Sequence, residues 1–268
     1  MKRFASRFLA AIAVAFIAPV AVAQEWNIQL VDDAGDVGYD SQIAVLSNGI
    51  PYIVYVGSSS DLKLAWWVEQ GGQSGWNFSI IGNATAGRAK EMLVDEQDRL
   101  HIAWNYGATS YYGIYNPATQ AWVLGPESVA FGMYYAHLDL ALWSSGGNLI
   151  PVIVATLDSN SAVKLAKRDP GTGVWSIETC SGTFTSDGAA SVAVGADGGL
   201  HVSFYERFGA NLVYAVKVAG GTTWMFQTID TGGTVGQYSS ILIDDVGDIH
   251  IAYYDTTNGD LKFASTTP

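Results

Sequence analysis

The stretch Ser239-Ser-Ile-Leu-Ile-Asp-Asp-Val-Gly-Asp-Ile-His-Ile-Ala-Tyr-Tyr-Asp-Thr-Thr-Asn-Gly-Asp-Leu-Lys-Phe-Ala264 contains three short apolar or alternating runs separated by turn residues. Such runs, rich in Ile, Tyr and Phe and bounded by Gly, Asp and Asn, are typical of β-strands joined by tight turns. The stretch therefore predicts strands over residues 239–243, 249–254 and 261–264.

The remainder of the chain repeats this unit at a nearly constant spacing. The second strand is marked by Pro51, His101, Pro151, His201 and His250, at intervals of 50, 50, 50 and 49 residues. A fourth strand opens at a tryptophan in four copies, at Trp76, Trp122, Trp175 and Trp224. A fixed period in this range with four strands per unit predicts an all-β, five-bladed β-propeller of four-stranded antiparallel blades. We expect one such domain over residues 24–268.

The two ends of the chain carry matching deficits. Residues 25–31 have the fourth-strand pattern but precede any first strand, and the last copy ends at its third strand. We expect the N-terminal strand to complete the last blade, because this closes the ring and leaves no unpaired edge.

The first 23 residues have the features of a signal peptide. A basic start with Lys2, Arg3 and Arg7 precedes an apolar run, and Ala21-Val-Ala23 forms a small-residue cleavage site. The apolar run is too short to span a membrane, which takes about 20 residues. We expect an exported protein, periplasmic or secreted, without membrane insertion after cleavage.

Charge and cysteine content narrow the possible partners. Removing the three positive charges of the leader changes the formal charge from −12 to −15. An acidic surface repels nucleic acid and anionic membranes, so neither is expected as a partner. Cys180 is the only cysteine, which excludes an intrachain disulfide, and we expect it to be a buried, unreactive thiol.

Strand alternation sorts the connections into two groups. The turns after first and third strands are short and rich in Gly and Asp, as structural turns require. The inter-blade loops and the turns after second strands share the other side, which we call the loop-rich side. Aromatic rings stack on sugars, and carboxylates, arginines and amides bind hydroxyl groups. The candidate ligand-binding residues there are Tyr39, Asp40, Arg88, Tyr106, Tyr134, Tyr135, Asp158, Glu206, Arg207, Gln237, Tyr238 and Asp255. The alternative is that these tyrosines only cover the core.

No metal or cofactor is predicted. His101, His201 and His250 occupy equivalent positions in separate repeats, too far apart for one ion whose nitrogen ligands lie about 2 Å away.

The repeat Ser-x-x-x-Asp-x-x-Gly-x-x-His-Ile-x-Tyr-Tyr-Asp resembles the repeats of exported bacterial β-propellers that are similar to sialidases. The segment Asp169-Pro-Gly-Thr-Gly-Val-Trp175 is similar to the sialidase Asp box but one residue longer. Sialidase activity would require three converging arginines. Two of the four arginines that follow the leader, Arg99 and Arg168, are expected on the side opposite the loop-rich side. The resemblance therefore implies a shared turn rather than shared chemistry. The repeat number also resembles that of tachylectin-type lectins.

Three functions are consistent with these observations. The first is a monomeric, non-catalytic, lectin-like protein that binds a glycan or small polar ligand on the loop-rich side. The second is a protein–protein scaffold of the cell envelope, which needs an exposed apolar patch. The third is a glycoside hydrolase that uses a carboxylate pair at the required separation. The candidate carboxylates for such a pair are Asp40, Asp158, Asp187, Glu206 and Asp255.

Overall fold

The computed structural model describes residues 27–85, 90–131, 137–156, 162–186 and 188–267. Within these ranges the protein consists of strands and turns, without a helix that could span a membrane. Residues 31–268 form one unit, and residues 1–30 form another, of which only 27–30 are described and are not in a strand. The all-β class predicted from the sequence is confirmed.

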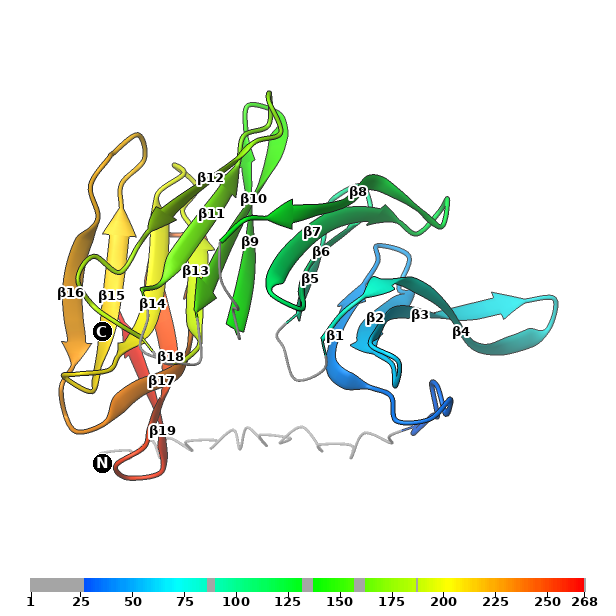
Figure 1. Cartoon of the computed structure of the whole chain (residues 1–268), viewed down its shortest axis with the longest axis horizontal. Helices are drawn as coiled ribbons and strands as arrows, with labels where there is room; N and C mark the ends of the chain where they lie inside the picture. The colour runs from blue at the N-terminus through cyan, green and yellow to red at the C-terminus, as the bar shows by residue number, and fades with distance from the viewer. Residues whose placement is uncertain (1–26, 86–89, 132–136, 157–161, 187, 268) are drawn as a thin grey trace, which may run out of the picture. The chain divides into compact units, whose positions relative to one another are not determined.

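The described residues form nineteen strands in five antiparallel sheets, and in each sheet the strands follow one another in chain order (Figure 1). Sheet 1 contains β1 (Tyr39–Val45), β2 (Pro51–Val56), β3 (Asp61–Gln70) and β4 (Gln73–Asn83). Sheet 2 contains β5 (Lys90–Val94), β6 (Leu100–Tyr106), β7 (Thr109–Asn116) and β8 (Ala121–Val129). Sheet 3 contains β9 (His137–Ser145), β10 (Asn148–Thr156), β11 (Lys164–Arg168) and β12 (Trp175–Thr179). Sheet 4 contains β13 (Ala190–Val194), β14 (Leu200–Glu206), β15 (Asn211–Lys217) and β16 (Met225–Asp230). Sheet 5 contains β17 (Val235–Ile243), β18 (Ile249–Asp255) and β19 (Asp260–Ser265).

Sheet 5 differs from the prediction because it has three strands. The described residues 27–31 are not in a strand, so the expected fourth strand and the closed ring are not confirmed. An outermost strand forms hydrogen bonds with only one other strand. For the expected fourth strand of sheet 5 that strand would be β19, which lies near the other end of the sequence. Pairing two such distant segments carries the loop-closure entropy of almost the whole chain.

The equivalence of the five second strands also needs a correction. Four of the third strands, all except β7, share an alanine, and its partners on the second strands are Ile53, Ile153, Val202 and Ile251. In sheets 4 and 5 the preceding residue is His201 or His250, whereas in sheets 1 and 3 it is Tyr52 or Val152. The prolines therefore lie one residue before the histidine position. A one-residue shift moves a side chain to the other face of the sheet, which spacing alone did not reveal.

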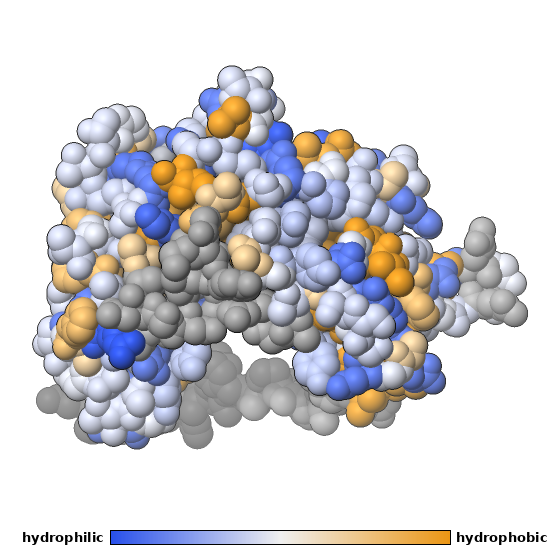
Figure 2. Space-filling model, in the orientation of Figure 1, coloured by the Kyte–Doolittle hydropathy of each residue, from blue (hydrophilic) through white to orange (hydrophobic). Residues whose placement is uncertain are grey.

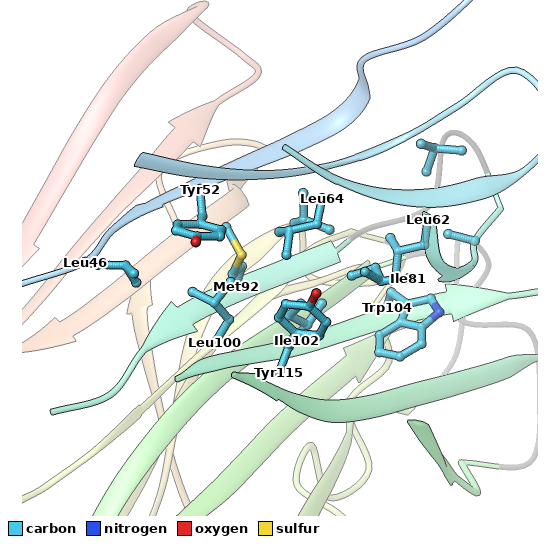
Figure 3. Close-up of a cluster of buried hydrophobic side chains, with 13 residues drawn as sticks. Leu46, Tyr52, Leu62, Leu64, Ile81, Met92, Leu100, Ile102, Trp104 and Tyr115 are labelled. Atoms are coloured by element: carbon cyan, nitrogen blue, oxygen red, sulfur yellow. The ribbon is translucent and has the colours of Figure 1, made fainter. Parts of the chain in front are cut away.

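The core lies between the sheets rather than within one layer. On the face shown in Figure 2, apolar residues at the surface form separate patches among mostly hydrophilic residues. Four buried clusters lie between consecutive sheets, from sheets 1 and 2 to sheets 4 and 5. Figure 3 shows the first cluster, in which Tyr52 and Leu64 of sheet 1 pack against Ile102 and Trp104 of sheet 2. Each of sheets 2, 3 and 4 thus uses opposite faces for its two neighbours. Cys180 is buried in the cluster between sheets 3 and 4, as predicted.

Polar side chains connect the first strands of adjoining sheets. The Asp139 carboxylate on β9 accepts hydrogen bonds from Ser191 Oγ and Val192 N of β13, both at 2.7 Å. Ser191 Oγ in turn accepts the Ile241 N–H of β17 at 3.1 Å. On β5, burial and then the charge of Asp139 raise the pKa of Glu91 to about 8. The first strands of the sheets therefore contain buried polar groups as well as apolar contacts.

Two histidines of the second strands, His101 and His250, bind the tight turns that precede them. His101 Nδ1 lies 2.5 Å from Tyr112 Oη on β7, and its Nε2 lies 3.1 Å from the Asp95 carboxylate in the preceding turn. His201 makes the same contact with Tyr214 at 2.6 Å, and His250 lies 3.0 Å from Asp244. The described residues contain no cluster of His, Cys, Asp and Glu suited to a metal ion. The histidines belong to separate sheets, and burial lowers the pKa of His101 and His201.

Candidate functional site

The loop-rich side is defined by hydrogen bonds between inter-sheet loops and the turns that follow second strands. Thr85 N donates to Asn105 O at 2.8 Å, where the loop after sheet 1 meets the turn after β6. The same contact recurs from Arg207 N to Thr185 O and from Thr256 N to Thr234 O, both at 2.9 Å. These bonds show that both kinds of connection lie together, as strand alternation predicts.

Aromatic side chains on these connections are open to solvent. Tyr106, at the end of β6, is 44% exposed, and Tyr238, on β17, is 66% exposed. Tyr39 at the start of β1 is also exposed, and its hydroxyl donates to Asp36 at 2.7 Å. Phe208, in the turn after β14, is 76% exposed and was missed in the sequence. Its position between Arg207 and Gly209, in a turn that tolerates polar residues, is the signal that could have identified it.

Two of the predicted residues have a strained backbone at a β-bulge. Asp40 on β1 and Tyr238 on β17 have φ angles of 49° and 52°, and each lies where the pairing with the second strand shifts register. A positive φ is unfavourable for a bulky residue, and bulges redirect side chains at the ends of sheets. Strain of this kind is frequent at binding sites, which makes these two positions notable.

Polar neighbours hold several of the predicted residues. The Asp40 carboxylate lies 3.2 Å from Lys90 Nζ, whose side chain is buried at the start of β5. Gln237 Oε1 accepts a hydrogen bond from Thr256 Oγ1 at 3.1 Å. Arg207 is exposed in the turn after β14. The sequence does not indicate the Asp40–Lys90 pair, because its members lie on different sheets.

The predicted carboxylates Glu206 and Asp255 are buried and bind the backbone of their own turns. Glu206 accepts the Phe208 and Gly209 N–H groups at 2.8 and 2.6 Å. Asp255 accepts the Asn258 N–H at 3.1 Å and its side-chain amide at 2.8 Å. These contacts give both carboxylates a structural role in the turns. The remaining predicted residues, Arg88, Tyr134, Tyr135 and Asp158, lie outside the described residues, as does Asp187.

An aromatic pocket of about 250 Å³ lies between sheets 1 and 2 on the loop-rich side. We call it the aromatic pocket, and its lining is Gly82, Asn83, Trp104, Tyr106, Tyr111 and Pro126. The rings of Trp104 and Tyr111 stack with centroids 5.6 Å apart, and Trp104 Nε1 donates to Asn83 O at 2.9 Å. These contacts hold the Trp104 and Tyr111 rings at the inner end of the pocket, while Tyr106 extends into solvent. The pocket therefore combines rigid aromatic walls with the exposed Asn83 at its edge.

The fold is similar to those of solved carbohydrate-binding proteins. The SapL1 lectin in complex with alpha methyl fucoside matches with a TM-score of 0.56 at 12% identity, over 87% of this chain and 81% of that chain. The fucose-specific lectin from Aleuria aurantia matches with a TM-score of 0.55 at 12% identity, over 85% and 76%.

NanB, a sialidase from Streptococcus pneumoniae, matches in its structure with Optactamide with a TM-score of 0.50 at 16% identity. The match covers 76% of this chain but 34% of that protein, so this chain spans about a third of NanB. No family model matches the sequence, and no curated protein matches it significantly. At these identities the likeness shows the fold alone, which fits a sialidase-like or lectin-like propeller.

Proposed function

We propose that this protein binds carbohydrate through its loop-rich side, with the aromatic pocket as the principal sugar contact. The observation that carries the proposal is the exposed ring of Tyr106 beside Asn83 and the half-buried Tyr111, whose ring stacks on the buried Trp104. Aromatic faces cover the C–H surfaces of a pyranose, and a small number of polar groups fix its hydroxyls. The lectin neighbours support the same class of ligand by fold analogy.

The described carboxylates support binding rather than hydrolysis. A glycosidase requires two carboxyl groups that both face the scissile bond. Glu206 and Asp255 bind their own turns, and Asp40 lies against Lys90. A carboxylate that is already engaged in a turn or an ion pair is poorly placed to act as general acid or nucleophile. We therefore favour a non-catalytic role.

The proposal includes the export and the closed architecture expected from the sequence. The leader at residues 1–23 would direct the protein to the periplasm or the exterior, where glycans are accessible. A closed ring of five blades would hold the loops of the loop-rich side in a constant arrangement.

The test is a glycan-array screen of the chain from Gln24 onward, followed by titration calorimetry with the best glycan. Tyr106→Ala and Tyr111→Ala should each weaken binding about 5- to 150-fold. This range corresponds to the roughly 1–3 kcal/mol measured when an aromatic ring is removed from a stacked base. Tyr106→Phe keeps the ring and should retain most of the affinity.

Val246→Ala is the matched surface control, because Val246 is exposed in the turn between β17 and β18, on the opposite side. Absence of binding to any glycan would refute the proposed function. Binding that survives both alanine variants would place the sugar elsewhere on the molecule.

A further inference from the structure

The turns between first and second strands have one geometry in four sheets and a different one in sheet 3. In sheets 1, 2, 4 and 5 the residue after the first strand donates to the carbonyl oxygen four residues later and accepts the N–H three residues later. Asp95 shows the pattern, with Arg99 O at 3.0 Å and Asp98 N at 2.9 Å. Sheet 3 instead has the two-residue turn Gly146-Gly147, whose φ angles are 57° and 78°. The β9–β10 hairpin therefore departs from the repeat.

Direct contacts close the boundaries on either side of this place, on the side opposite the loop-rich side. Between sheets 1 and 2, the Ser47 N–H and hydroxyl donate to the Asp98 carboxylate at 2.7 and 2.5 Å. Between sheets 3 and 4, Trp143 of β9 lies so close to Gly198 that a Cβ at Gly198 would overlap its ring. The boundary between sheets 2 and 3, by contrast, is open.

A groove of about 330 Å³ lies there, between the turn after β5 and the β9–β10 hairpin, and we call it the turn groove. Its volume is within the range of ordinary small-molecule sites, about 300–1,000 Å³. The turn groove combines apolar side chains with a carboxylate, a hydroxyl and an amide. These residues are Val94, Leu142, Leu149, Glu96, Ser144 and Asn148.

One carboxylate of the turn groove is not engaged by the protein itself. Asp95 accepts the Gln97 and Arg99 N–H groups at 3.0 and 2.9 Å, and it also accepts Arg99 Nε at 2.7 Å. Asp98 is held by the contact from sheet 1 described above. Glu96 is exposed, and no hydrogen bond or ion pair holds its side chain within the part of the chain that the structure describes. Glu96 therefore faces the turn groove as an available anion.

The opposite wall of the turn groove adds neutral acceptors. Asn148 donates its amide to Gly146 O at 3.4 Å, so its carbonyl oxygen is left to accept a hydrogen bond. Ser144 is exposed beside it on β9. In the turn at residues 95–99, three carboxylates stand against one arginine, in a chain whose formal charge is −12. A negative potential with acceptors on both walls favours a cationic ligand.

We propose that the turn groove binds a small organic cation, namely an alkyl chain that ends in an ammonium or guanidinium group. The alkyl part packs on Val94, Leu142 and Leu149. The cationic end donates to the Glu96 carboxylate, and Asn148 Oδ1 is its second acceptor. Because the turn groove lies on the side opposite the aromatic pocket, this binding does not depend on a glycan.

Nuclear magnetic resonance tests the site, with pentylamine as the probe and the chain from Gln24 onward as the protein. Pentylamine is cationic at neutral pH, as a lysine side chain is, and pentanol is the matched uncharged compound. Pentylamine should shift the Gly146 and Gly147 amide signals in a saturable way, with a Kd of about 1–10 mM for so small a ligand. Pentanol should bind at least about tenfold more weakly, because it lacks the charge-assisted hydrogen bond.

Three variants locate the binding. Glu96→Gln keeps the shape of the side chain and should weaken pentylamine binding about tenfold or more, to the level of pentanol. Asp245→Asn is the matched control, because Asp245 is exposed at the same position of the equivalent turn in sheet 5, and it should leave the affinity unchanged. Ser144→Phe fills the turn groove from an exposed position and should abolish the shifts.

Three results would overturn the proposal. The first is the absence of saturable shifts with pentylamine. The second is equal binding of pentylamine and pentanol, which would show that only the alkyl chain is recognised. The third is an equal loss of affinity in Glu96→Gln and Asp245→Asn, which would show a general attraction of cations to an acidic surface instead of a site.

Discussion

The two sides of the five sheets use the same residue types in opposite ways. On the tight-turn side, acidic and aromatic side chains point into the protein and form hydrogen bonds with one another, as in the Asp95–His101–Tyr112 contact. On the loop-rich side the aromatic residues Tyr106, Phe208 and Tyr238 extend into solvent. The carboxylates on that side have two kinds of partner. Glu206 and Asp255 accept hydrogen bonds from the backbone, whereas Asp40 lies against a lysine.

This difference separates residues that maintain the fold from residues available to a ligand. A buried side chain with complete hydrogen bonding contributes to stability, and its loss leaves its partners unsatisfied. An exposed aromatic residue contributes little to stability, and its retention at a strained backbone position needs another explanation. The following variants test this separation, from the largest expected effect on stability to the smallest.

His101→Ala should destabilise the protein by about 3 kcal/mol, because it leaves the Tyr112 hydroxyl without its buried partner and removes one from Asp95. Chemical denaturation measures the effect, and glycan affinity should not change. His250→Ala is the control, since its ring is more exposed and the loss should be smaller. Equal losses for the two variants would contradict the role given to burial.

Glu91→Gln should remove a pH dependence of stability. The folded-state pKa of Glu91, about 8, lies above the ordinary glutamate pKa of 4.5, so the folded protein retains a proton that the unfolded chain releases. The wild type should therefore lose up to about 1.4 kcal/mol of stability for each pH unit as pH rises from about 4.5 through 8. The Gln variant should lack this component in melts between pH 5 and pH 9.

Glu96→Gln, in the exposed turn after β5, is the matched control and should follow the wild type. If Glu91→Gln also follows the wild type, Glu91 is ionised in the folded protein at neutral pH.

Glu206→Gln should cost about 1 kcal/mol, because an amide oxygen can replace only part of the carboxylate's bonds to Phe208 N and Gly209 N. Denaturation and calorimetry measured together decide between its two possible roles. A stability loss with unchanged affinity supports the turn contact. Unchanged stability with a tenfold loss of affinity would instead show that Glu206 binds the ligand.

Tyr238→Gly should have the smallest effect on stability, within about 1 kcal/mol and in the stabilising direction. Glycine adopts the φ of 52° without strain, and the tyrosine is mostly exposed. If Tyr238 contacts the sugar, affinity should fall while the melting temperature is maintained or rises. A clear loss of stability would instead show that its ring covers the core.

The repeat pattern predicted most of the fold because strands and tight turns are local features. The sheets begin and end close to the predicted positions, and the sorting of loops into two sides followed from alternation alone. The candidate site was less predictable. The partner of Glu206 is a backbone N–H two or three residues later, and only turn geometry shows that the carboxylate turns inward. The aromatic pocket joins Asn83 to Tyr106 and Tyr111 across two sheets, a contact that no local pattern encodes.

The one-residue difference between the second strands also affects how this protein could be redesigned. A consensus blade averaged from the five repeats would place Pro51 and Pro151 in the same column as His201 and His250. The averaged residue would then face the wrong neighbouring sheet in two of the five copies. An alignment anchored on the third-strand alanine avoids this error and separates the sheets into a histidine type and a proline type. Sheets of one type should exchange more readily in chimaeras than sheets of different types.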